Sequence, residues 1–282
     1  MKSLRKFIFI IPLLLVCTVV WGCQSGSDGD DGGVQPSKKG TLRIGSYNVY
    51  YCKSNTGTPA YTDQNTQNVA TVIDALDYDI LSVQELDSGF VDRQNKRYLL
   101  ADIASKTKKK YRYIYGPAHE FGTASVGVGV LVNTDLKVLS TKKVALPGEE
   151  KRALLMVEFE DFWFIATHYD LIDANRVESS KIVMQEIKKI NKPVYLAGDL
   201  NINNTTNEAY NILAQSFVPV TPLTYNDGKV KNTIDYVLYS DNGTGNKPVF
   251  KGSKIETEMK LGGKLVLSQV SDHPPIWVNI EK

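Results

Sequence analysis

Polar side chains able to bind a cation or carry a proton stand where apolar segments of this sequence end or begin. A carboxylate or imidazole buried at the end of a strand costs free energy unless it is paired or binds a metal. The set comprises Asn48, Glu85, His168, Asp199, Asn201, Asp235, Asp272 and His273. If these strand ends meet at one edge of a sandwich of sheets, they form a pocket of carboxylates, amides and imidazoles.

Each member of this set also has a purely structural interpretation. Asn48 and Asn201 could satisfy turn backbone, as asparagine commonly does. Glu85 and Asp235 could be solvated strand ends, and His168 could be a hydrogen-bonded core residue. The segment DLNIN matches the start of a calcium loop, but position 6 is Asn rather than Gly and position 12 is Tyr rather than Glu, so that loop is rejected.

The C-terminal stretch SDHPPIWVNIE places an Asp-His pair before two prolines and a strand. Ile276, Val278 and Ile280 alternate with Trp277 and Asn279, which predicts a strand with one face in the core. Proline fixes φ and favours extended backbone at the residue before it. The two prolines are therefore expected to hold the pair rigidly at the rim of a site, although a plain polar turn fits the same residues.

Six motifs occur along the chain in the order SYNV, VQEL, THYD, GDLN, IDYV and SDHPP. In this order the chain resembles the endonuclease/exonuclease/phosphatase superfamily, which includes deoxyribonucleases, AP endonucleases, bacterial sphingomyelinases and inositol polyphosphate 5-phosphatases. The resemblance implies a four-layer α/β sandwich, with two mixed β-sheets packed face to face and helices outside. It also implies hydrolysis of phosphate esters with Mg²⁺ or Mn²⁺.

The resemblance further implies a role for each polar residue. Glu85 corresponds to the principal metal-binding carboxylate, with Asn48 and Asp272 beside the metal or its waters. His273 corresponds to the catalytic histidine, oriented by Asp235. The remaining implied roles are nucleophile positioning or phosphate contact for Asp199 and Asn201, and phosphate binding or leaving-group assistance for His168. Such roles agree with the charge neutralisation that attack on a phosphate ester requires.

The pattern of apolar residues predicts elements that could position these side chains. Strands are expected over 41–51, 79–86, 111–119, 126–133, 136–146, 152–160, 162–170, 193–201, 233–240, 251–259 and 276–280. Helices are expected over 65–79, 92–106, 179–190 and 207–216. The order of the strands within the sheets does not follow from the sequence.

The N-terminal region has the layout of a bacterial lipoprotein signal. Lys2, Arg5 and Lys6 precede an apolar run that ends at Gly22-Cys23, so residues 1–22 are expected to be a signal peptide and Cys23 the lipidated residue. Residues 23–40 read as a flexible acidic tether, leaving 41–282 as the folded domain. We therefore expect a monomer in the cell envelope, held to a bacterial membrane through its lipid alone and displayed on the outer surface.

Charge and substrate are less closely defined by the sequence. Five of the 33 Lys and Arg residues and three of the 31 Asp and Glu residues precede residue 41, so the domain is neutral with 28 of each. A basic-aromatic segment, SKTKKKYRYIYG, could grip DNA or RNA, or could be a solvated turn. Extracytoplasmic nucleic acid is the first expectation. Phospholipid, a small phosphate ester and a non-catalytic binding lipoprotein are the alternatives.

Overall fold

The computed structural model describes residues 40–58, 60–259 and 265–281. The expected signal peptide, Cys23 and all but the last residue of the expected tether lie outside this part of the chain. No helix among the described residues is long and apolar enough to span a membrane.

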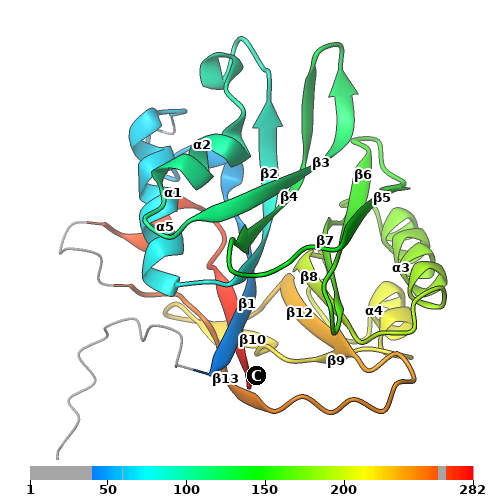
Figure 1. The fold of residues 1–282 in the computed structure, drawn as a ribbon. Helices are drawn as coiled ribbons and strands as arrows, with labels where there is room; N and C mark the ends of the chain where they lie inside the picture. The colour runs from blue at the N-terminus through cyan, green and yellow to red at the C-terminus, as the bar shows by residue number, and fades with distance from the viewer. Residues whose placement is uncertain (1–39, 59, 260–264, 282) are drawn as a thin grey trace, which may run out of the picture. The chain divides into compact units, whose positions relative to one another are not determined.

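Two six-stranded mixed sheets form the centre of the domain (Figure 1). The first has the order β13 (Phe250–Ile255), β14 (Ile276–Glu281), β1 (Thr41–Asn48), β2 (Ile80–Ser88), β4 (Ala124–Asn133), β3 (Tyr111–Phe121). The second has the order β5 (Ser140–Leu146), β6 (Arg152–Glu158), β7 (Trp163–His168), β8 (Val194–Asp199), β12 (Asp235–Ser240), β9 (Val218–Pro219). The β1–β2 and β7–β8 pairs are parallel, and the other pairs are antiparallel.

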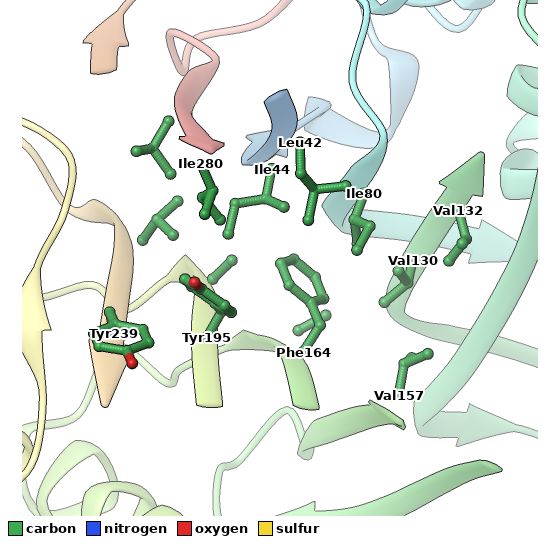
Figure 2. Packing of buried hydrophobic residues seen from close by; sticks show 14 of the residues in the cluster. Leu42, Ile44, Ile80, Val130, Val132, Val157, Phe164, Tyr195, Tyr239 and Ile280 are labelled. Carbon is green, nitrogen blue, oxygen red and sulfur yellow. The ribbon is translucent and has the colours of Figure 1, made fainter. Parts of the chain in front are cut away.

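Alternation along the strands divides the buried residues into three layers of core. Successive side chains of a strand point to opposite faces of its sheet. In β8, Tyr195 and Ala197 therefore join the core between the sheets, whereas Val194 and Leu196 face α3 (Asp173–Ile187) and α4 (Glu208–Leu213). Figure 2 shows the core between the sheets, with Ile44 and Ile80 of the first sheet above Phe164 and Tyr195 of the second.

The helices on the first sheet follow the expected apolar spacing. In α1 (Asp63–Leu76), Val69, Val72 and Ile73 are fully buried and pack in one cluster with Leu99 of α2 (Leu99–Lys106). The Oγ1 atom of Thr62 accepts a hydrogen bond from the Asn65 N–H at 3.1 Å and caps α1. Together with α5 (Leu267–Val270), these helices cover the outer face of the first sheet. The predicted four-layer sandwich is confirmed.

Left-handed backbone shortens two of the predicted elements. The helix expected over 92–106 begins only at Leu99, because Asn95 and Lys96 have φ values of 47° and 61° in the short turn η2 (Gln94–Lys96). The strand expected over 41–51 ends at Asn48, since all three residues of the following turn η1 (Tyr50–Cys52) have positive φ. Residues other than glycine rarely adopt a positive φ, and the alternation of apolar residues does not predict where they do so.

Both faces of the last strand are covered, which goes beyond the single buried face expected. Ile276, Val278 and Ile280 point into the core between the sheets as predicted. On the other face, Asn279 Oδ1 accepts a 2.9 Å hydrogen bond from Nε of the buried Arg43. A short hairpin of β10 (Thr224–Asn226) and β11 (Val230–Asn232) stands apart from both sheets.

Candidate active site

Strand register places three of the predicted site residues in one row across the second sheet. His168 at the end of β7 is the register partner of Asp199 at the end of β8, and Asp199 is the partner of Asp235 at the start of β12. Partners in register present their side chains on the same face. All three side chains are buried. Gly198 lets these strands meet, because a Cβ at that position would lie 2.0 Å from the carbonyl oxygen of Thr167.

His273 reaches this row from the loop before β14. Its Nδ1 lies 2.8 Å from Asp235 Oδ2, and its Nε2 lies 3.7 Å from Asp199 Oδ2. Ser271 holds the loop against β1: its Oγ donates to the Asn48 carbonyl at 2.7 Å and accepts from the His273 N–H at 3.2 Å. The loop is thus tied down by Ser271 as well as by the prolines that follow.

A β-bulge turns Glu85 toward the site from the first sheet. The β2–β4 ladder pairs Val83 with Gly129 and then Leu86 with Gly127, so Gln84 and Glu85 together oppose one residue of β4. Glu85 has φ 56°, in the left-handed region. Bulges are common next to active sites, where they redirect a side chain. Simple alternation along β2 would not have given Glu85 this direction.

Asn48 connects the two sheets at the site. Its Nδ2 donates to Glu85 Oε1 at 2.9 Å and to Asp199 Oδ2 at 3.2 Å, while its Oδ1 accepts from the Tyr50 N–H at 3.0 Å. One fully buried amide therefore lies between a carboxylate of the first sheet and a carboxylate of the second.

The two site histidines face the same oxygen with different charge states. His168 Nε2 lies 3.6 Å from Asp199 Oδ2, and its Nδ1 lies 3.2 Å from Nη1 of Arg152. Burial, reinforced by the charges of Arg152 and His273, lowers the pKa of His168 well below its ordinary value, so this ring is neutral. Burial alone would lower the pKa of His273 too, but the charge and hydrogen bond of Asp235 outweigh it and raise that pKa to about 10.

Burial also shifts the two carboxylates that flank Asn48. It raises the pKa of Glu85, against the opposing effect of the Asn48 hydrogen bond. It raises the pKa of Asp199 as well, with the charge of Asp235 acting in the same direction. Both carboxylates are destabilised as anions by their surroundings, and a cation bound nearby would reverse that cost.

Carboxylate oxygens that could hold a hard divalent cation lie on the Glu85 side of the site, where Glu85 Oε1 and Asp199 Oδ2 both accept from Nδ2 of Asn48. Among the described residues, Asp199, Asp235 and His273 have potential ligand atoms within 4.8 Å of one another. His273 is a poor ligand there, because Asp235 occupies its Nδ1 and the raised pKa keeps Nε2 protonated. Carboxylate and amide oxygens suit Mg²⁺ or Mn²⁺ better than imidazole does.

Two other predicted residues occupy less direct positions. Asp272 lies at the rim, with 43% of its side chain exposed and Oδ1 4.0 Å from His273 Nε2. The backbone N–H of Asn201 donates to Asp199 Oδ1 at 2.9 Å, and its side-chain amide donates to the Tyr169 carbonyl. Asn201 thus orients Asp199. A contact between Asn201 and phosphate, like a metal contact by Asp272, stays a prediction.

The basic run lies at the other end of the first sheet. Tyr111 pairs with Asn133 at the far end of β4, six residues from Gly127 beside the bulge, or about 20 Å along a strand. Lys109 Nζ pairs with Asp77 at 2.9 Å and with Asp79 at 3.2 Å. This contact matches the alternative of a charged turn and gives the run no place at the site.

Sequence reasoning gave Arg152 no definite role and overlooked Thr233 and Ser271. Thr233 Oγ1 accepts from the Asp235 N–H at 3.0 Å and fixes the start of β12. A hydroxyl two residues before a site residue, Thr233 before Asp235 in TID and Ser271 before His273 in SDH, is a weak signal for such a local hydrogen bond. Arg152, the partner of His168, lies at the start of β6, whereas His168 ends β7. The distance between them along the sequence therefore does not predict their contact.

Comparison with known proteins agrees with the fold. A sequence model of the Endonuclease/Exonuclease/phosphatase family matches residues 45–273, and the chain belongs to this family of phosphate-ester hydrolases. No match to the sequence is found among curated proteins.

Solved structures share the fold at low sequence identity. A mannosyl-6-phosphatase of Bacteroides thetaiotaomicron has a TM-score of 0.63 at 19% identity, covering 85% of this chain and 99% of its own. Truncated Caenorhabditis elegans TDP2 has a TM-score of 0.62 at 18% identity, with 86% and 98% covered. D. rerio TDP2, complexed with a single-strand DNA product, has a TM-score of 0.60 at 18% identity, with 86% and 99% covered.

Proposed function

We propose that this protein hydrolyses phosphate esters with the help of a divalent cation. The observation that carries the proposal is the convergence on Asp199 Oδ2, which His168, His273 and Asn48 approach within 3.2 to 3.7 Å. A phosphate ester in hydrolysis needs donors for its oxygens and an acceptor for the proton of the attacking water. This cluster holds both, next to Glu85.

The residues divide the work between them. The protonated His273, held by Asp235, would stabilise the charge that grows on the phosphoryl group, and the neutral His168 would donate Nε2–H to a phosphoryl oxygen. Asp199, with its raised pKa, would accept the proton of the attacking water. Glu85, with Asn48 and Asp272 as predicted further contacts, would hold Mg²⁺ or Mn²⁺, which supplies charge neutralisation at the phosphate.

Substrate and location complete the proposal. Nucleic acid outside the cytoplasm was the first expectation from the sequence, and the family fold is shared with TDP2, whose D. rerio form is complexed with a DNA product. The same fold is shared with a mannosyl-6-phosphatase, and this likeness favours a small ester. Attachment to the cell envelope through Cys23 rests on the signal-like N-terminus.

The test is hydrolysis of p-nitrophenyl phosphate and bis-p-nitrophenyl phosphate by the full chain. We expect turnover with Mg²⁺ or Mn²⁺, loss of turnover in EDTA, and recovery when metal is added back. His273→Ala should abolish turnover in a folded protein. Turnover that persists in EDTA, or its absence with every ester and metal tried, would refute the proposal. A binding lipoprotein without catalysis would give the second result while keeping its ligand in the His273→Ala variant.

A further inference from the structure

A cavity of about 250 Å³ opens beside His273. Its walls come from distant parts of the chain: Asn55 after η1, Tyr225 and Lys231 of the β10–β11 hairpin, Thr257 after β13, and Ser268 of α5. A group bonded to a phosphate held at His273 would extend into this space. The cavity is therefore placed to receive the alcohol part of a phosphate ester.

Hydrogen bonds between the walls keep the cavity in shape. Asn55 binds α5 twice, through its N–H to the Gln269 carbonyl at 2.8 Å and through Nδ2 to the Ser268 carbonyl at 2.9 Å. Thr257 Oγ1 donates to the Asn226 carbonyl of the hairpin at 3.4 Å. The hairpin, which belongs to neither sheet, is thus tied to the segment after β13.

The charges of the walls do not favour a polyanion. Lys231 Nζ already pairs with Asp227 Oδ2 at 2.7 Å. Glu256 also lines the cavity and pairs with Lys254 at 2.7 Å. Binding of a nucleic acid strand calls for a positive groove with free lysines or arginines. These walls offer carboxylates, amides and hydroxyls beside the ring of Tyr225, which suit a neutral ligand rich in hydroxyl groups.

We infer that this cavity binds a small uncharged polyhydroxy alcohol, so that the substrate is the phosphate ester of a sugar or polyol. The inference rests on the proposed function. Water attacks phosphorus, the bond between phosphorus and the alcohol oxygen breaks, and that oxygen takes a proton, giving a free sugar and inorganic phosphate. The cavity lies below the roughly 300–1,000 Å³ typical of ligand pockets, which matches a single sugar unit better than a polymer segment.

The experiment compares esters that differ in the alcohol. Release of phosphate by the full chain with Mg²⁺ would be measured for mannose 6-phosphate, glucose 6-phosphate, p-nitrophenyl phosphate and a 5′-phosphorylated single-stranded oligonucleotide; cleavage of that strand would be measured as well. We expect the highest kcat/KM for a sugar phosphate. Asp227→Asn replaces a charged acceptor of the cavity wall by a neutral amide, and Tyr225→Ala removes an aromatic ring from that wall. Each should lower the ratio of kcat/KM for the sugar phosphate to that for p-nitrophenyl phosphate by about 10- to 100-fold.

Matched controls and outcomes separate this inference from the proposed function. Asp161→Asn and Tyr113→Ala change exposed residues outside the cavity and should leave the ratio as it is. Turnover of p-nitrophenyl phosphate with sugar phosphates no better, or with the oligonucleotide preferred, would overturn the inference and leave the proposed function standing. An unchanged ratio in folded Asp227→Asn would also overturn it. Absence of turnover with every ester would overturn both.

Discussion

Arg152 and His168 form a contact that fixes which nitrogen of the imidazole carries the proton. Nη1 of Arg152 lies 3.2 Å from Nδ1 of His168. A guanidinium stays charged and can only donate, so Nδ1 must accept and the proton must sit on Nε2. The Nε2–H then points toward Asp199 Oδ2, 3.6 Å away. His168 therefore works as a neutral donor, and His273 is the charged imidazole of the site.

Replacing Arg152 by Met should release the tautomer of His168. The chain has three histidines, which makes their ¹⁵N signals straightforward to assign. In the native protein, His168 should show a protonated Nε2 and an unprotonated Nδ1. In Arg152→Met both tautomers should be populated. We expect kcat to fall about 10- to 100-fold, the usual effect of losing a residue that orients a functional imidazole. Arg176→Met is the matched control. Native-like signals from His168 in Arg152→Met would contradict the assignment.

Asp235→Asn should lower the pKa of His273 from about 10 toward the ordinary value of 6.5. NMR titration of the ring in EDTA measures this directly. A folded pKa above the unfolded value stabilises the native state fully below about pH 6.5, and this contribution is lost as the pH rises to about 10. The native protein should thus lose stability over that window relative to Asp235→Asn. Equal dependence on pH in both proteins would show that Asp235 does not raise this pKa.

Glu85→Gln should keep the fold and weaken metal binding. The amide preserves the shape of the side chain but removes the anionic ligand, so turnover at limiting Mg²⁺ should drop on the order of a hundredfold. This loss is at or above the largest effect usually seen when a residue that only supports a metal ligand is replaced. Added Mn²⁺ should restore part of the rate by mass action. Calorimetric titration with Mn²⁺ gives the affinity independently of turnover. Near-normal turnover at limiting Mg²⁺ would move the metal to Asp199 and Asp272.

Gly198→Ala tests the close approach of β7 and β8. The added Cβ would lie 2.0 Å from the Thr167 carbonyl oxygen, so the strands must separate. We expect the free energy of unfolding to fall by at least about 1–3 kcal/mol, measured by urea denaturation, and turnover to fall as well, since the next residue is Asp199. Gly57→Ala is the control, because a Cβ there meets no atom within 4 Å. Equal stability of the two variants would show that the strands can adjust.

Apolar periodicity was enough to predict most of the strands, whereas the four-layer sandwich was implied by the family resemblance. Ile276, Val278 and Ile280 lie in the core between the sheets as their alternation indicates. The polar strand ends also met, because parallel β7 and β8 end at the same edge. Strand order did not follow, since it depends on contacts between segments far apart in the chain. The bulge at Glu85 did not follow either, because its left-handed φ of 56° breaks the alternation on which the prediction relied.

The amide of Asn48 has a consequence for how activity appears during folding. It donates to Glu85 of one sheet and to Asp199 of the other, so the predicted metal ligand and the proposed proton acceptor belong to separate sheets of the sandwich. Either sheet alone carries an incomplete set. Catalytic competence must therefore arise only when the two sheets dock. The return of turnover during refolding then measures when the core layer between the sheets forms, even if each sheet has already gained its hydrogen bonds.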